Sequence, residues 1–268
     1  MKSTRGQAVS RPQGSPVSLF RSWAEIRLRV RAAKRLAIFL DFDGTLVGLR
    51  RRPGDVRVPK RLKRILASLA RHANVSIAIV SGRRLRDLQS LIGIESVRYF
   101  GLHGAEQEGK RPALTKETRL ALGRAKREAR MQLGVLPGVW LEDKVCSLAI
   151  HYRGASAAFV REAYEKLLRL LALLHHELSV IPGEKVWEIL PREFAGKGTT
   201  VLELLTEMPR GTLAVYAGDD TSDETAFATL TDQITIQVGR RPGSRAQFRL
   251  RNPTELLRFL ARMERELP

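Results

Sequence analysis

Three short, almost wholly apolar segments, each ending in polar residues, constrain the fold of this chain most. They span residues 36–40, 75–80 and 213–217. Uninterrupted apolar runs of this length are typical of strands buried on both faces of a parallel sheet. Helical spacing of apolar residues follows the first two runs, at residues 59–71 and 85–92. This alternation of strands and helices predicts an α/β fold.

The pattern changes between residues 107 and 191. Two helical segments there accompany two pairs of adjacent strand-like stretches. Adjacent strands backed by helices are typical of an antiparallel α+β unit. We therefore predict a parallel-sheet core over residues 36–106 and 192–268, interrupted by an inserted α+β domain over residues 107–191.

The first 35 residues carry nine basic residues and one acidic residue. The composition of residues 1–16 predicts little stable order. Residues 17–35 fit a basic amphipathic helix, with Leu19, Trp23, Ile26 and Val30 on one face. We predict a partly disordered basic extension over residues 1–35, and its Arg- and Ser-rich start also resembles an organelle transit peptide.

The whole chain of 268 residues has a formal charge of +19. Such an excess is typical of proteins that bind nucleic acid, an anionic membrane surface or an anionic small substrate. Basic residues cluster at residues 50–64 and 240–251, but neither cluster has a nucleic-acid-binding motif. No apolar run approaches the roughly 20 residues of a membrane helix. We expect no specific nucleic acid partner and no transmembrane segment. A non-enzymatic basic scaffold that binds nucleic acid or membranes is the alternative.

A single cysteine, Cys146, excludes an intrachain disulfide framework. This is typical of a reducing compartment, so we expect a cytoplasmic protein. We expect a monomer.

Polar side chains follow each of the three apolar runs. Asp41 and Asp43 follow the first run and Ser81 the second, and three aspartates, Asp219, Asp220 and Asp223, follow the third. Lys197 begins a predicted helix before the third run. Ligands bind beyond the carboxyl ends of the strands in open α/β sheets, so we expect these side chains to meet.

Several carboxylates in one place favour a hard divalent cation, above all Mg²⁺. A hydroxyl and an ammonium group beside the ion would hold the oxygens of a phosphoryl group. One aspartate can then attack phosphorus, while Asp43 protonates the leaving group and later activates water. The residues therefore predict phosphoryl transfer on a phosphate ester.

Four motifs resemble those of the haloacid dehalogenase (HAD) superfamily of phosphatases. They are Asp41-Phe-Asp-Gly-Thr-Leu46, Ser81-Gly-Arg83, Lys197, and the stretch Gly218–Glu224. The closer similarity is to the trehalose-6-phosphate phosphatase family. It rests on the stretch Gly101–Glu106, on Glu142, Asp143, Lys144, Ser147 and His151-Tyr-Arg153, and on Lys185, Glu188, Pro191 and Lys197-Gly198.

The resemblance implies a HAD-like Rossmannoid core with an inserted α+β cap of the C2 type. It implies that Asp41 is the nucleophile and a Mg²⁺ ligand, that Asp43 is the general acid/base and a ligand through its backbone carbonyl, and that Asp219 is the third ligand. Asp223 would orient the groups around the metal. Ser81 and Lys197 complete the expected catalytic set. The expected substrate-binding residues are Asp41, Asp43, Gly44, Arg83, Glu106, Lys144, His151, Arg153, Lys185 and Glu188.

The activity that the resemblance implies is Mg²⁺-dependent hydrolysis of trehalose 6-phosphate to trehalose and phosphate through an aspartyl-phosphate. A phosphatase of sucrose 6-phosphate or mannosyl-3-phosphoglycerate is the alternative, because those relatives share the core motifs. The identity of the sugar then depends on the cap. For Trp140 and Trp187, which lie in predicted cap strands, we predict packing in the cap core, with a sugar-binding platform as the alternative.

Overall fold

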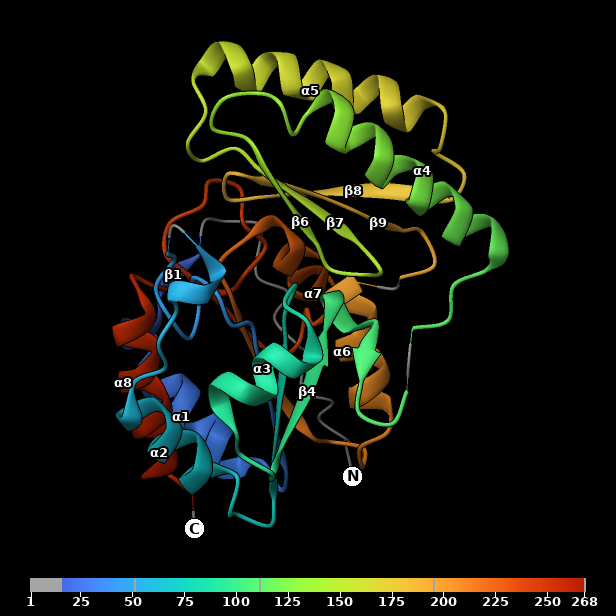
Figure 1. Cartoon of the computed structure of the whole chain (residues 1–268). Helices are drawn as coiled ribbons and strands as arrows, with labels where there is room; N and C mark the ends of the chain where they lie inside the picture. The colour runs from blue at the N-terminus through green and yellow to red at the C-terminus, as the bar shows by residue number, and fades with distance from the viewer. Residues whose placement is uncertain (1–15, 51, 111, 195, 268) are drawn as a thin grey trace, which may run out of the picture.

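The computed structural model describes residues 16–50, 52–110, 112–194 and 196–267, and shows a core below a smaller cap (Figure 1). Within these residues the core holds one eight-stranded sheet. Its strands, in spatial order, are β1 (Val17–Ser18), β12 (Phe248–Leu250), β11 (Ile234–Val238), β10 (Leu213–Gly218), β2 (Leu36–Leu40), β3 (Val75–Val80), β4 (Val97–Gly101) and β5 (Glu106–Gln107). All neighbours are parallel except β4 and β5.

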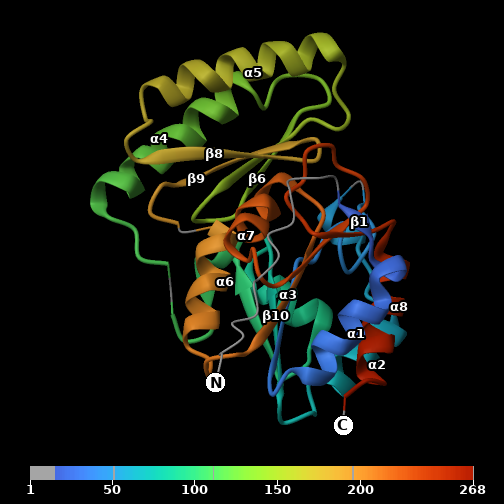
Figure 2. The same ribbon diagram turned by 180° about the vertical axis from the view of Figure 1, so that it is seen from behind.

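Helices cover both faces of this sheet, which explains why its central strands are apolar throughout. Ile38 on β2 packs in a cluster with α1 (Trp23–Ala32), α2 (Lys60–Leu69), α3 (Leu85–Ile92) and α8 (Pro253–Glu264). Phe39, the next residue, points to the other face and packs with α6 (Gly196–Thr206) and α7 (Glu224–Thr229). Figure 2 shows these two helices from behind. The predicted parallel α/β core is confirmed.

The segment before β2 is part of the core. Strand β1 pairs with β12, and helix α1 begins only at Trp23. Leu19, Ile26 and Val30 are fully or almost fully buried. The prediction of an extension over residues 1–35 is therefore wrong for residues 17–32, because their apolar face packs against the core; residues 1–15 lie outside the described residues.

The cap is a four-stranded antiparallel sheet with two helices. Its strands, in spatial order, are β6 (Trp140–Asp143), β7 (Leu148–His151), β9 (Val186–Pro191) and β8 (Leu178–Gly183). Helices α4 (Lys116–Gln132) and α5 (Ala157–Ala172) cover the face of this sheet that points away from the core (Figure 1). Ile150 and Trp187 pack on that face, so the prediction for Trp187 is confirmed.

Side chains alternate between the two faces of the cap sheet. The residues next to the buried ones, including Trp140, Glu142, His151 and Glu188, therefore face the core and line the space between the two parts. Among the described helices, none is long and apolar enough to cross a membrane.

Candidate active site

Three neighbouring strands bring the predicted catalytic residues to one edge of the core sheet. Leu40, the last residue of β2, is paired with Ala217 of β10 and with Ile79 of β3. The residues that follow these strands therefore emerge side by side. Asp41, Ser81 and Asp219, together with Lys197, line one cavity between the core and the cap.

Three carboxylates in this cavity form the aspartate cluster, which we define as Asp41, Asp219 and Asp223. Each offers an oxygen within 4.8 Å of the others. One oxygen of Asp223 accepts hydrogen bonds from Lys197 Nζ at 2.7 Å and Tyr216 Oη at 2.6 Å. Its other oxygen accepts two backbone N–H groups of the loop after β10, at 3.0 and 2.9 Å. Because both oxygens of Asp223 are already engaged, Asp41 and Asp219 are the better metal ligands.

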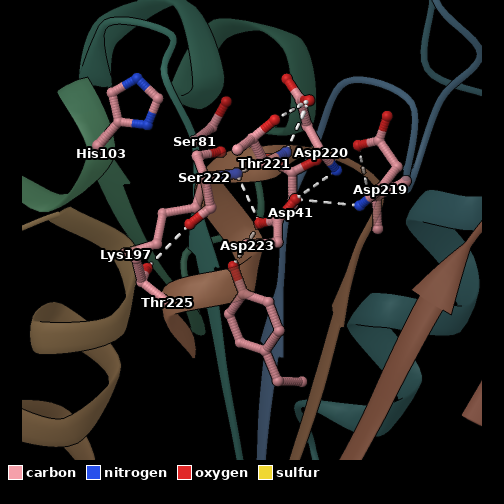
Figure 3. A network of polar contacts seen from close by, with 12 residues as sticks. Asp41, Ser81, His103, Lys197, Asp219, Asp220, Thr221, Ser222, Asp223 and Thr225 are labelled. Carbon is pink, nitrogen blue, oxygen red and sulfur yellow. Dashed lines mark hydrogen bonds and ion pairs between the residues drawn. The ribbon is translucent and has the colours of Figure 1, made fainter. Parts of the chain in front are cut away.

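Lys197 is the buried cation of the site. Its ammonium group donates to Asp41 Oδ1 at 2.6 Å and to Asp223 Oδ1 at 2.7 Å (Figure 3). Only 3% of the residue is exposed. Burial alone would lower the pKa of Lys197, but the carboxylates of Asp223 and Asp41 raise it overall. Lys197 therefore stays charged and fixes the orientation of Asp41.

One lysine does not balance three carboxylates, of which Asp41 and Asp223 are buried and Asp219 is half-buried. Burial, opposed by Lys197 and reinforced by Asp223, raises the pKa of Asp41 to about 6. Burial, together with Asp41 and Asp223, raises the pKa of Asp219 well above its usual range. Oxygen ligands that are short of positive charge suit a hard divalent cation. The side chains of Asp41 and Asp219 thus fit the metal site expected from the sequence.

The loop after β2 brings Asp219 close to Asp41. Gly44 has a φ of +85°, and a Cβ atom there would lie 2.0 Å from Asp219 Oδ2. Thr45, which is fully buried, donates from Oγ1 to Asp219 Oδ1 at 3.0 Å. Glycine is therefore required at position 44 both by the backbone conformation and by the space that Asp219 occupies.

Asp43 stands apart from the aspartate cluster. The Arg83 guanidinium donates two hydrogen bonds to its carboxylate, at 2.6 and 2.8 Å, and one to the Pro53 carbonyl at 3.0 Å. Ser81 is buried, and its Oγ accepts the Arg83 backbone N–H at 3.2 Å. Arg83 was predicted to bind substrate; in the structure it holds the predicted general acid in place.

A buried set of polar contacts joins the cap to the core, and we call it the core–cap network. From the cap, Lys144 Nζ donates to the Gly82 carbonyl of the core at 2.9 Å and to Glu188 Oε2 at 3.0 Å. Glu188 also contacts His103 Nε2 of the core at 3.2 Å and accepts Ser147 Oγ at 2.7 Å. Burial would raise the pKa of Glu188, but Lys144 and His103 hold it well below its usual range. Two predicted sugar ligands, Lys144 and Glu188, thus lie at the core–cap junction.

His103 lines the cavity but was not among the predicted site residues. Leu102 and His103 both have positive φ, 48° and 58°, an unfavourable backbone for residues other than glycine. The His103 ring is buried, and its Nδ1 has no hydrogen-bond partner in the described part of the chain. Its position just after β4, at the same sheet edge as Asp41, was the signal that could have identified it.

The remaining predicted substrate-binding residues divide into two groups. His151 and Arg153 line the cavity, and Arg153 donates to the Glu184 carbonyl at 3.0 Å. Glu106 and Lys185 do not line it. The Glu106 carboxylate instead accepts the Leu85 backbone N–H at 2.8 Å where α3 begins, and Lys185 lies exposed in the turn between β8 and β9.

Trp140 lies in the cavity wall, with 37% of the residue exposed. The prediction that it packs in the cap core is wrong, because it faces the core, opposite to Trp187. The pairing of Trp140 with His151 across β6 and β7 puts both on the same face of the cap sheet.

Solved structures place the fold of this chain in a known class. The C-terminal domain of the C. albicans trehalose-6-phosphate phosphatase matches with a TM-score of 0.79 at 21% identity, covering 94% of this chain and 99% of that chain. A haloacid dehalogenase-like hydrolase from Bacteroides thetaiotaomicron matches with a TM-score of 0.62 at 14% identity, covering 86% and 100%. A parallel sheet with aspartates at its carboxyl edge, below an inserted α+β cap, is the fold of the HAD-like phosphatases.

Sequence similarity then identifies one family within that class. Residues 39–253 match the family described as trehalose-phosphatase. The trehalose-phosphate phosphatase of Mycobacterium tuberculosis is 33% identical over 256 residues, covering 88% of this chain and 63% of that protein. The chain belongs to the trehalose-phosphatase family, and it spans less than two thirds of the length of this relative.

Proposed function

We propose that this chain hydrolyses trehalose 6-phosphate to trehalose and phosphate, with Mg²⁺ as cofactor and an aspartyl-phosphate on Asp41 as intermediate. The observation that carries the proposal is the buried contact between Lys197 and Asp41 within the aspartate cluster. Membership of the trehalose-phosphatase family supports the choice of substrate. Mg²⁺, held by Asp41, Asp219 and the Asp43 carbonyl, would supply positive charge beside the phosphoryl oxygens.

The first step is attack by a carboxylate oxygen of Asp41 on phosphorus. Lys197 donates to Asp41 Oδ1 at 2.6 Å and so orients the carboxylate for the attack. An oxygen–phosphorus bond forms as the bond from phosphorus to the sugar oxygen breaks. Asp43 gives its proton to the departing sugar oxygen. Arg83 donates a hydrogen bond to each oxygen of Asp43 in the structure. One of these two hydrogen bonds must lengthen or break when that oxygen of Asp43 carries the proton.

In the second step, Asp43 takes a proton from a water molecule that attacks the phosphorus of the aspartyl-phosphate. The bond between phosphorus and Asp41 breaks, phosphate forms and the free carboxylate returns. Lys197 and Ser81 stabilise the phosphoryl oxygens throughout. The cap excludes bulk water from this exchange.

The test measures phosphate release from trehalose 6-phosphate, with Mg²⁺ and with a chelator. We expect Asp41→Asn to lose at least a thousandfold in kcat, because no other carboxylate replaces the nucleophile. Asp55→Asn is the matched control, because Asp55 is exposed and does not line the cavity. Equal turnover by Asp41→Asn and the unsubstituted protein would refute the role of Asp41.

The same assay distinguishes the possible sugars. Sucrose 6-phosphate and mannosyl-3-phosphoglycerate are run beside trehalose 6-phosphate at equal concentrations. A clearly higher kcat/KM for either alternative would overturn the proposed substrate and leave the proposed chemistry at Asp41 intact.

A further inference from the structure

We propose that Trp140, backed by the stacked ring of His151, forms a platform for one pyranose ring of a disaccharide phosphate, and that Trp140 makes the enzyme prefer such esters over smaller ones. This inference rests on the proposed function, because it concerns the sugar part of the same substrate. For Trp140 it favours the alternative given by the sequence, a sugar-binding platform, over packing in the cap core.

The platform is built by the register of the cap sheet. Trp140 on β6 lies directly opposite His151 on β7, and His151 lies opposite Val186 on β9. The Trp140 and His151 rings are stacked, with centroids 3.9 Å apart and planes 4° from parallel. All three side chains line the cavity. They form one apolar row across three strands.

The exposure of Trp140 distinguishes it from the other tryptophan of the cap. Trp187 is 7% exposed and packs under the cap helices, whereas Trp140 is 37% exposed in a cavity that also holds carboxylates and lysines. Burial of a large aromatic surface is favourable, and the exposed part of Trp140 does not contribute this free energy to folding. A ligand that covers the exposed part gains it as binding free energy. The exposed area of Trp140 is therefore available for binding.

The platform is held in place before a ligand arrives. His151 Nε2 contacts Glu142 Oε2 at 2.9 Å, which fixes the imidazole against the indole. The carboxylate in turn is held charged: burial would raise the pKa of Glu142, but the hydrogen bond from His151 and the charge of Lys144 lower it overall. A rigid platform costs little conformational entropy when a ligand binds.

A second row of residues lies beside the apolar one. Glu142 is paired with Ala149, and Ala149 with Glu188, on the same face of the cap sheet. A pyranose ring has an apolar face of C–H groups and a rim of hydroxyls. An aromatic side chain next to a carboxylate matches both features, because the indole packs on the C–H face while the half-buried Glu142 accepts a hydroxyl hydrogen.

The experiment compares kcat/KM for trehalose 6-phosphate, sucrose 6-phosphate and acetyl phosphate, which carries no ring. It uses the full chain, Trp140→Ala, Trp140→Phe and, as a control, Leu168→Ala, which shortens an exposed apolar side chain on the outer cap helix. We expect Trp140→Ala to lower kcat/KM at least tenfold for the preferred disaccharide phosphate, through KM, and to leave acetyl phosphate within twofold. Trp140→Phe should keep most of the activity, and Leu168→Ala all of it.

The results test the role of Trp140 as a platform and the choice of trehalose 6-phosphate as substrate separately. If sucrose 6-phosphate is preferred and Trp140→Ala loses that preference over acetyl phosphate, the platform stands and trehalose 6-phosphate is overturned. If Trp140→Ala keeps the ratio of disaccharide phosphate to acetyl phosphate within twofold of the unsubstituted chain, the platform is overturned. Failure of the unsubstituted chain to cleave either disaccharide phosphate would overturn both.

Discussion

Replacing Lys197 by methionine should destabilise the protein by an amount that depends on pH. The substitution removes the ammonium group that contacts Asp41 and Asp223 at 2.6 and 2.7 Å and leaves a side chain of similar length. Both carboxylates are almost completely buried. Breaking a buried ion pair from one side typically costs about 3–5 kcal/mol, because the remaining charge has no counter-charge.

Protonation of a carboxylate relieves part of this cost at low pH. With Lys197 present, the pKa of Asp41 is already raised by burial to about 6, and it must rise further without the lysine. A carboxyl group whose pKa is higher in the folded than in the unfolded state loses stabilising free energy as the pH rises between those values. At about 1.4 kcal/mol per unit, the loss should be about 2 kcal/mol smaller at pH 5.5 than at pH 8.

The assay is urea unfolding in metal-free buffer at pH 5.5 and pH 8. The control is Lys166→Met, which removes a lysine that contacts Glu162 at 2.7 Å on the surface of α5 and should cost about 0.5 kcal/mol or less at both pH values. A loss below about 1 kcal/mol at pH 8 for Lys197→Met, or an equal loss at both pH values, would refute Lys197 as the counter-charge of the aspartate cluster.

Three further predictions test other parts of the structure. Gly44→Ala should weaken Mg²⁺ binding at least tenfold in calorimetry, since the new Cβ would lie 2.0 Å from Asp219 Oδ2, whereas Gly54→Ala meets no atom within 4 Å and should bind normally; equal affinities would contradict this role. Ile26→Ala should cost about 2–5 kcal/mol in urea unfolding, and Leu28→Ala, at a site 65% exposed, within about 0.5 kcal/mol; a small loss at Ile26 would show that α1 is not part of the core. Mg²⁺ should raise Tm more at pH 7.5 than at pH 5, because burial raises the pKa of Asp41 to about 6 and that carboxyl group must lose its proton to bind metal. An equal rise in Tm at both pH values would count against that coupling.

The polar side chains at one edge of the core sheet were predictable because the same local sequence pattern occurs at each central strand. Each central strand is an apolar run with its polar residues immediately after it, and parallel strands put those residues on one edge. The meeting of Asp41, Lys197 and Asp219 follows from that arrangement. The antiparallel cap was predictable for a similar reason, since its strands are adjacent in the sequence.

The features that could not be predicted from the sequence depend on which part of the folded protein packs against a given side chain. The amphipathic pattern of residues 17–32 is the same whether its apolar face packs on this core or elsewhere. Trp140 and Trp187 both lie in cap strands, and only the side on which α4 and α5 pack decides which one is buried. Motif similarity likewise identified Glu106 as a site residue, but not the direction in which its carboxylate points.

The position of β2 in the core sheet affects how the chain can fold while it is being synthesised. Its two neighbours are β3, which follows shortly in the sequence, and β10, which comes only after the whole cap. During synthesis the strand that precedes Asp41 therefore keeps one unpaired edge while the cap strands are completed and free to fold. Such an edge can pair wrongly with another strand, so the nascent chain can aggregate at this stage. β12, the last strand to be made, is the only strand neighbour of β1 within the described sheet. The first strand of the core can therefore pair only after almost the whole chain has been made.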